Sequence, residues 1–343
     1  MMQDSLLELK KLLGTIKLHN TCFSVLPTVL KSSTVNDKDF ITNSWTNERI
    51  FNYRSNIISL YGCFEQFIES SIKEYFNELL KICHSFTELD ESIRREYIDR
   101  WKTLHGRLHF NKFQTITPTF MVKSLYNSLV KDKNEIIAEC FLQNGGNYRI
   151  EEIRKSFSTL GLTNLNETLR NYEPLVSYYS QNGFDNYSKI DEIVDRRNEI
   201  AHGANADDLL SESIVLDYVD YVEMYAESLT SYLNDQLLEH KWKIANPYRI
   251  IKPINFYTRN SVVEFHEKDI ILREKMDMLV KKPKDYFPRY VSEKLPPFRA
   301  KKAQASLSAI KNYNELYGDG DWMFSFQTNY KMTTKFRIAL YLS

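Results

Sequence analysis

Residues 188–203 have the apolar spacing of an amphipathic helix, and one position breaks that pattern. At about 100° per residue, Ile190, Val194 and Ala201 fall on one stripe. Arg197 falls on the same stripe, where an aliphatic residue is expected. Because a guanidinium on an apolar face needs a partner or a ligand, the segment predicts a helix that brings a charged group to its buried side.

The ends of this helix are predicted from two local signals. Ser188 is followed three residues later by Asp191, which is the spacing of a capping box. Gly203 occupies the position of a left-handed C-terminal cap. These signals bracket a helix of roughly four turns.

Three polar side chains are expected to converge near the end of this helix. Asn198 and His202 are one turn apart on nearly the same line, and Arg197 lies beside them. The stretch Arg-Asn-Glu-Ile-Ala-His-Gly closely resembles the signature of the HEPN superfamily, whose members are helical bundles. The resemblance implies that Arg197 and His202 are the catalytic pair and that Asn198 is a polar residue that assists them.

Many HEPN proteins are metal-independent endoribonucleases of toxin-antitoxin and anti-phage systems. The resemblance therefore implies cleavage of RNA without a metal or a cofactor. It also implies a homodimer, in which the same helix of a second protomer completes the active site. A cognate antitoxin or another defence-system partner is implied as well.

The implied chemistry uses the 2′-hydroxyl of RNA as the nucleophile and yields 2′,3′-cyclic phosphate and 5′-hydroxyl ends. Imidazole exchanges a proton near neutral pH, so His202 would move the protons, while Arg197 would hold the non-bridging phosphate oxygens. DNA is disfavoured because it lacks the 2′-hydroxyl. The alternative is a catalytically inactive HEPN-type module for dimerisation or for RNA or protein binding, because cations also favour helix C-termini for structural reasons. A nucleotide-binding regulatory bundle is a third interpretation.

Supporting roles are expected for three further residues. Asp195 and Arg196 directly precede the catalytic arginine. Glu65 lies in a long helix predicted from about Asn47, and it would face the motif helix if the two helices pack side by side. For Glu65, an ordinary surface position is the competing interpretation.

Composition favours a globular protein of the cytoplasm. Hydrophobic residues make up 43% and charged residues 26% of the 343 residues, and we find neither a signal-peptide core nor an apolar run long enough to span a membrane. The four cysteines are widely separated, so the sequence predicts no disulfide framework. His105 and His109 are four residues apart, but they have no evident third ligand, and we expect no metal site.

The predicted fold is mainly α, with three parts. Residues 1–46 form an accessory helical segment, with a helix over residues 4–18 and a loop near residues 32–39. Residues 47–245 form a HEPN-like helical bundle, with a turn at residues 143–147. Residues 246–343 form a small, basic, β-rich domain, since residues 241–343 hold 20 Lys and Arg against 10 Asp and Glu.

Two patterns predict how the second half of the chain is built. Apolar residues from Val215 to Leu233 recur at helical spacing, which predicts a helix packed antiparallel to the motif helix through its apolar stripe, with a dimer seam as the minority alternative. Short runs at residues 261–266, 269–273, 322–327 and 335–342 predict strands. Residues 318–321, Gly-Asp-Gly-Asp, are expected to form a turn between strands, with their aspartates as metal ligands a weaker alternative.

A basic and aromatic segment at residues 281–302 is a candidate RNA-contacting region. Positive charge follows phosphates, and aromatic rings stack on unpaired bases. An equally weighted alternative is a solvated loop whose aromatic rings turn inward. The candidate RNA-binding residues are Lys281, Lys282, Lys284, Arg289 and Arg299.

Overall fold

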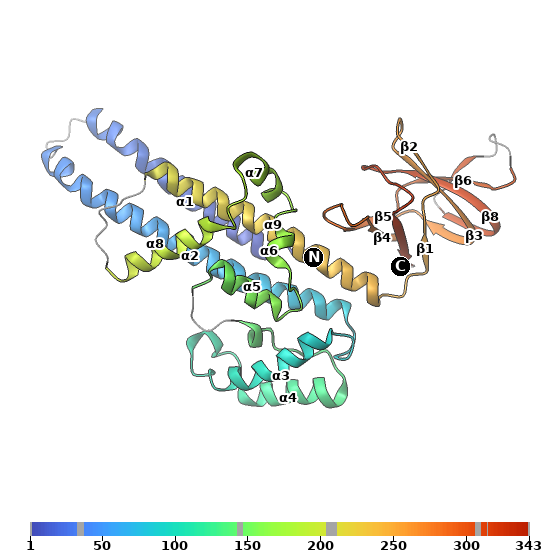
Figure 1. The fold of residues 1–343 in the computed structure, drawn as a ribbon, viewed down its shortest axis with the longest axis horizontal. Coiled ribbons are helices and arrows are strands. Elements are labelled where there is room, and N and C mark those ends of the chain that lie inside the picture. The colour runs from blue at the N-terminus through green and yellow to red at the C-terminus, as the bar shows by residue number, and fades with distance from the viewer. Residues whose placement is uncertain are drawn as a thin grey trace. The chain divides into compact units, whose positions relative to one another are not determined.

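The computed structural model describes residues 2–32, 38–142, 147–203, 211–305, 310–313 and 315–341. The chain divides into two compact units, Met1–Asn234 and Asp235–Ser343. The helices lie in the first unit and the strands in the second, apart from the C-terminal end of the last helix (Figure 1). The loop and the turn predicted near residues 32–39 and 143–147 fall largely on residues 33–37 and 143–146, which lie outside the described residues.

Three long helices form the frame of the first unit: α1 (Asp4–Ser32), α2 (Lys38–Ile82) and α9 (Glu212–Ile244). Figure 1 shows them side by side. Helix α1 runs antiparallel to both of the others. Its ion pairs with α9 include Lys10–Glu227 and Lys17–Asp220. Its hydrogen bonds with α2 include Glu8–Gln66 and Asn20–Asn56.

Shorter helices complete the first unit. Helix α4 shows why one of them begins where it does: the Thr117 hydroxyl accepts from Phe120 N at 3.1 Å, and Pro118 follows at the first helical position. The short helices are α3 (Glu91–His105), α4 (Pro118–Lys131), α5 (Ile150–Ser158), α6 (Leu165–Leu169), α7 (Leu175–Asn182) and α8 (Ser188–Ala201). Two 3₁₀ turns cover Asn111–Phe113 and Ala138–Phe141.

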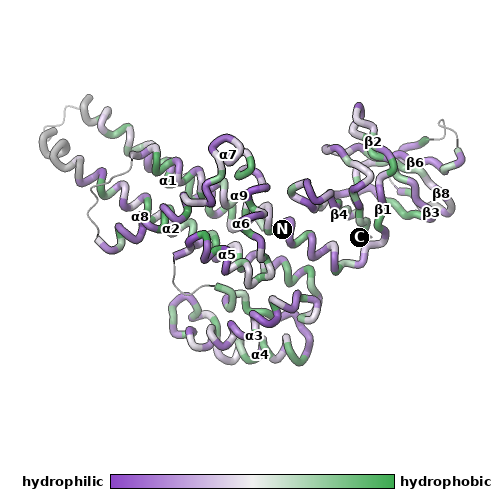
Figure 2. Tube along the Cα trace, viewed as in Figure 1, coloured by the Kyte–Doolittle hydropathy of each residue, from purple (hydrophilic) through white to green (hydrophobic). Residues whose placement is uncertain are grey.

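The apolar stripe of α9 is buried inside the first unit, so the predicted core packing is confirmed. Every stripe residue from Val215 to Leu233 is buried. Helix α8 lies antiparallel to α9, since Tyr187 at its start contacts Tyr225 with ring centres 5.8 Å apart, whereas Glu192 further along accepts from Tyr218 OH at 2.9 Å. In Figure 2, hydrophobic and hydrophilic residues are interspersed along α9.

No helix in the described part of the chain combines the length and the apolar character that a bilayer span requires.

Helix α1 is longer than the sequence predicts. It passes the expected end near residue 18 and contains Pro27, which removes one backbone donor from the helix. Its distal half packs on α2, where Phe23 stacks on Trp45 with ring centres 4.9 Å apart. Helix α2 likewise begins at Lys38, earlier than the predicted start near Asn47. Packing between the two helices therefore outweighs the local signal of the proline.

The described residues of the second unit form two antiparallel sheets. One has the order β1-β9-β4-β5 and the other has the order β2-β3-β8-β6-β7. The predicted fold class, mainly α with a β-rich C-terminal domain, is confirmed. The strands are β1 (Arg249–Ile251), β2 (Asn255–Tyr257), β3 (Val262–Arg273), β4 (Asp277–Lys281), β5 (Tyr290–Lys294), β6 (Phe298–Lys302), β7 (Lys311–Tyr313), β8 (Glu315–Gln327) and β9 (Arg337–Tyr341).

The two sheets face each other across one apolar core. Met278 and Ile338 of the four-stranded sheet contribute to the same buried cluster as Phe265 and Phe324 of the five-stranded sheet. The opposite side of the four-stranded sheet is covered by the end of α9, where Leu238 packs with Leu279, Tyr290 and Ala339. The central strands of this sheet, β9 and β4, are therefore buried on both faces.

The turn predicted at residues 318–321 is wrong, because these residues lie inside strand β8. The two strands expected at residues 261–266 and 269–273 are likewise one strand, β3, with a bulge between Lys268 and Ile270. Asp269 sits in the bulge with a positive φ of 49°, and its Oδ1 accepts from Gly320 N at 2.6 Å. The glycines and aspartates thus accommodate a bulged ladder.

Candidate functional site

Helix α8 begins at Ser188, but the predicted capping box is wrong. The N-cap residue is Tyr187, with a positive φ of 65° and no side-chain capping bond. The Ser188 hydroxyl turns instead to Asp185 Oδ2 at 3.2 Å. Asp191 accepts from Ile150 N at 2.9 Å, so its carboxylate caps the start of α5. The capping box does not form because the Ser188 hydroxyl and the Asp191 carboxylate both form hydrogen bonds with groups outside α8.

The end of α8 agrees with the sequence. His202 is the first residue after the helix, and its N–H donates to Asn198 O at 3.0 Å. Gly203 has a φ of +72°, the left-handed conformation predicted for it. The turn therefore leaves the His202 side chain exposed at the helix terminus.

Arg197 and Asn198 are joined by a hydrogen bond. Arg197 Nη1 donates to Asn198 Oδ1 at 3.1 Å, and both side chains are half-buried. Because the amide oxygen of Asn198 accepts from arginine, its amide nitrogen is left to donate to a ligand. The two residues together form a pair of oriented donors one turn before His202.

Tyr61 on α2 supplies the surface under Arg197. The guanidinium carbon lies 5.2 Å from the centre of the Tyr61 ring, within range of a cation-π interaction. The Tyr61 hydroxyl accepts from Tyr148 N at 3.0 Å, which fixes the ring from its other end. This explains how a charged residue is tolerated on the apolar stripe of α8. Tyr61 was not among the predicted site residues, because it has the helical spacing of an ordinary core residue.

Glu65 lies one helical turn after Tyr61 and is half-buried. The pKa of its carboxyl is raised, because burial and the neighbouring Glu69 carboxylate disfavour its charge more than Lys112 and Arg197 favour it. Lys112 forms an ion pair with Glu69, and Tyr148 OH donates to Glu69 at 3.2 Å. Helices α2 and α8 pack against each other, so Glu65 belongs to the electrostatic surroundings of Arg197.

Asp195 and Arg196 have other partners. Asp195 forms an ion pair with Arg149, which lowers the pKa of its carboxyl. Arg196 lies 3.6 Å from Glu199 of the same helix. Within the described part of the chain, no carboxylate forms an ion pair with Arg197. Of the two adjacent arginines, Arg196 therefore has a carboxylate partner among the described residues and Arg197 has none.

The basic segment is divided between the two sheets of the second unit. Lys281 lies over the Trp242 and Tyr290 rings and Lys282 over the Tyr330 ring, each within 5.5 Å of the ring centre. Burial lowers the pKa of Lys282. Arg289 lies over Tyr290, Lys284 is exposed, and Arg299 is exposed on strand β6 of the other sheet. The structure therefore separates Arg299 from the other four residues.

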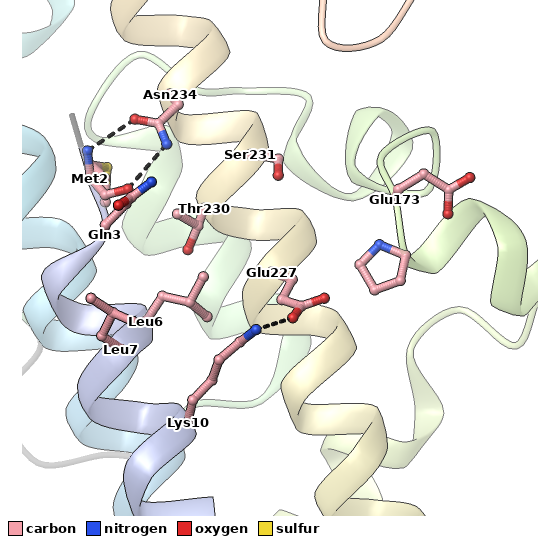
Figure 3. Close-up of a pocket in the computed structure, with 11 residues that line it drawn as sticks. Met2, Gln3, Leu6, Leu7, Lys10, Glu173, Glu227, Thr230, Ser231 and Asn234 are labelled. Carbon is pink, nitrogen blue, oxygen red and sulfur yellow. Dashed lines mark hydrogen bonds and ion pairs between the residues drawn. The ribbon is translucent and has the colours of Figure 1, made fainter.

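A hollow of about 490 Å³ lies at the start of α1 (Figure 3). It is lined by Met2 and Gln3, by residues of α1 and α9 and by Glu173 and Pro174, and the Lys10–Glu227 ion pair crosses it. None of its lining residues belongs to α8. This hollow is separate from the Arg197 site.

Across the described ranges, no group of three or more His, Cys, Asp or Glu side chains is arranged to hold a metal ion. His105 stacks on Trp101, and the His109 ring lies tilted against the Phe110 ring.

Comparison with known proteins gives one match. A family model described as RiboL-PSP-HEPN matches residues 30–235, which is more than half of the chain and includes all of α8. The curated proteins and the solved structures contain no match.

Proposed function

Because the chain belongs to the RiboL-PSP-HEPN family, we propose that it is a metal-independent endoribonuclease acting through Arg197, Asn198 and His202. HEPN domains are often ribonucleases, and they commonly dimerise and bind RNA. The family match also extends far beyond the short motif that first indicated the superfamily.

The observation that carries the proposal is the state of Arg197. Its guanidinium is oriented by Asn198 and by the Tyr61 ring, and no described carboxylate neutralises it by an ion pair. A phosphate needs such a preoriented cation, because its charge grows on the non-bridging oxygens in the transition state. Arg197 would bind these oxygens, and the Asn198 amide nitrogen would donate to the same phosphate.

The reaction is a transesterification. The ribose 2′-oxygen attacks phosphorus and loses its proton, and the bond from phosphorus to the 5′-oxygen breaks as that oxygen gains a proton. The products are a 2′,3′-cyclic phosphate and a 5′-hydroxyl. His202 is exposed at the end of α8, where its imidazole can exchange one of these protons with substrate.

One imidazole does not readily serve as acid and base in the same step. A homodimer that pairs two α8 helices would supply two histidines and two arginines around one phosphate. The exposure of His202 and the half-burial of Arg197 support such an open, shareable site. We extend the proposal to a toxin or phage-defence effector with a cognate antitoxin or another defence-system partner.

The direct test is cleavage of labelled single-stranded and structured RNA, with and without EDTA, by wild type and His202→Ala. We expect cleavage that resists EDTA, leaves cyclic-phosphate ends and disappears in the variant. Equal cleavage by both proteins would assign the activity elsewhere. Absence of cleavage together with retained RNA binding would instead favour the non-catalytic binding module. Growth arrest on expression of wild type, but not of His202→Ala, tests the effector role.

A further inference from the structure

The five-stranded sheet of the second unit carries a hollow of about 850 Å³ at one end. Its lining includes Arg259 and Asn260 of the turn between β2 and β3, together with Arg299, Asn312, Ser325 and Gln327 of strands β6, β7 and β8. A volume of this size lies in the usual range of ligand pockets. None of the activity proposed for α8 uses it.

Strand register places the polar lining residues on the outer face of the sheet. Phe298, Phe324 and Phe326 point into the core, so the residues that alternate with them point outward. Arg299 is directly opposite both Asn312 and Ser325. Side chains paired in this way share one face, so β7, β6 and β8 present a continuous polar row.

Arg299 is oriented within that row. Its Nε donates to Asn312 Oδ1 at 3.2 Å, which leaves the Nη groups of the guanidinium directed to other acceptors. The side chain is exposed. The arrangement parallels that of Arg197, where an asparagine oxygen also holds the guanidinium.

The charged residues that line the hollow are both arginines. Arg259 and Arg299 have no ion-pair partner in the described part of the chain, and no carboxylate is among the lining residues. Glu264 stands opposite Ser325 on the same face, but its carboxylate accepts from Asn255 at 3.0 Å and from Tyr257 at 3.1 Å. The hollow therefore combines two unneutralised guanidiniums with amide groups.

We propose that this hollow binds nucleotides of a single-stranded RNA. Arg259 and Arg299 would hold phosphates, and the side-chain amides of Asn260, Asn312 and Gln327 would bond to base edges or ribose hydroxyls. The choice of an RNA strand rests on the proposed ribonuclease function. The same chemistry of phosphate and base would also fit a free nucleotide.

The test uses full-length protein carrying His202→Ala, so that RNA stays intact. Binding of a labelled single-stranded RNA of twelve nucleotides is measured by fluorescence anisotropy, for this protein and with Arg259→Gln and Arg299→Gln added. We expect roughly tenfold weaker binding of the RNA by the double arginine variant. The slope of the logarithm of the binding constant against the logarithm of the salt concentration should become shallower by about 1.4, for two lost phosphate contacts. Lys331→Gln with Lys335→Gln is the matched control. These two substitutions also remove two positive charges, but at exposed residues that do not line the hollow.

A second variant, Ser325→Glu, adds a carboxylate opposite Arg299 and should weaken binding in the same way. Competition by a mononucleotide identifies the ligand: displacement of the RNA at comparable concentration would show that the hollow takes a free nucleotide. Binding of both ligands unchanged in the arginine and glutamate variants would overturn the inference. RNA cleavage by wild type would in that case still support the proposed ribonuclease function. If wild type never cleaves RNA but the variants bind RNA more weakly, the RNA-binding role of the hollow is supported and the ribonuclease function is not.

Discussion

The Arg197 guanidinium lies 5.2 Å from the centre of the Tyr61 ring, so the proposed phosphate-binding cation on α8 rests on an aromatic face of α2. We therefore treat Tyr61 as a positioning residue. Tyr61→Leu should lower kcat of RNA cleavage by roughly 2- to 30-fold, the equivalent of a cation-π interaction, with a smaller change in KM. Single-turnover and steady-state rates on one RNA substrate provide the measurement.

Tyr61→Phe is the control for this change, because it keeps the ring and removes only the hydroxyl that accepts from Tyr148 N. This variant should lose about 1 kcal/mol of stability but retain kcat. Equal kcat values for the leucine and phenylalanine variants would show that the ring does not position Arg197.

Replacing Arg197 by lysine should lower cleavage by roughly 100-fold or more. Lysine keeps the charge but loses the planar fork that can bind two phosphate oxygens while donating to Asn198. Arg196→Lys, one residue away and paired with Glu199, should stay within about threefold of wild type, because an exposed ion pair contributes little. The comparison is of kcat/KM, with RNA affinity measured separately. A larger loss from the Arg196 variant than from the Arg197 variant would show that Arg196, and not Arg197, binds the phosphate.

A composite site makes a distinct prediction for mixed dimers. Arg197→Ala and His202→Ala homodimers should each be inactive, whereas mixing the two proteins, unfolding them and refolding them together should restore part of the activity. A mixed dimer carries one intact arginine and one intact histidine. The rate is measured against the mixing ratio, with sedimentation to report the dimer. No recovery at any ratio, with dimers present, would contradict a site in which one arginine and one histidine from different protomers suffice to act on a phosphate.

The contacts of Glu74 predict that the folded protein loses stability as the pH falls. Its carboxylate accepts from the backbone N–H groups of Gln3, Asp4 and Ser5 and from the Ser5 hydroxyl, so it caps α1 from α2. Burial raises the pKa of Glu74, but these hydrogen bonds outweigh it and the pKa is lowered. A lowered pKa gives stability that is present above the ordinary carboxyl range and is lost as pH falls through the lowered value.

Glu74→Gln should therefore cost about 1 kcal/mol at pH 7, as for other lost helix caps, and the difference from wild type should shrink toward pH 3. Denaturant unfolding across this range measures it. Glu48→Gln, exposed on the same helix, is the control. A constant difference at all pH values would contradict the assigned pKa.

Glu65 should show the opposite sign. Its pKa is raised, so the folded state holds the proton more tightly than the unfolded chain does. The resulting stability is present at low pH and is lost as pH rises through the raised value. Glu65→Gln should thus be more stable than wild type at pH 8, with the gain decreasing toward pH 4. Thermal unfolding at both pH values checks this, and a gain that grows on acidification would contradict it.

The features that the sequence predicted are those set by neighbouring residues. The left-handed conformation of Gly203 follows from a helix end, and the burial of the α9 stripe follows from spacing alone. The position of Asn198 beside Arg197 likewise follows from helix geometry. Each of these depends on residues within one or two turns.

The features that were missed depend on residues far apart in the chain. Glu74 caps a helix that begins 70 residues earlier, and Asp191 caps one that begins 41 residues earlier. The Tyr61 ring lies under Arg197 only because α2 packs on α8. Sequence spacing identified α2 as a helix, but it could not show which of its residues would meet the motif.

The bulge at Asp269 has a consequence for how the β unit tolerates length changes. Before it, the inward residues of β3 are odd-numbered, such as Val263 and Phe265; after it they are even-numbered, such as Ile270 and Leu272. Strand β8 keeps one parity throughout, from Leu316 to Phe326. Asp269 is thus the position at which the alternation of β3 changes phase. Deleting Asp269 would place the inward residues of both halves on one parity of a regular strand, whereas deleting another residue within β3 would turn one half inside out.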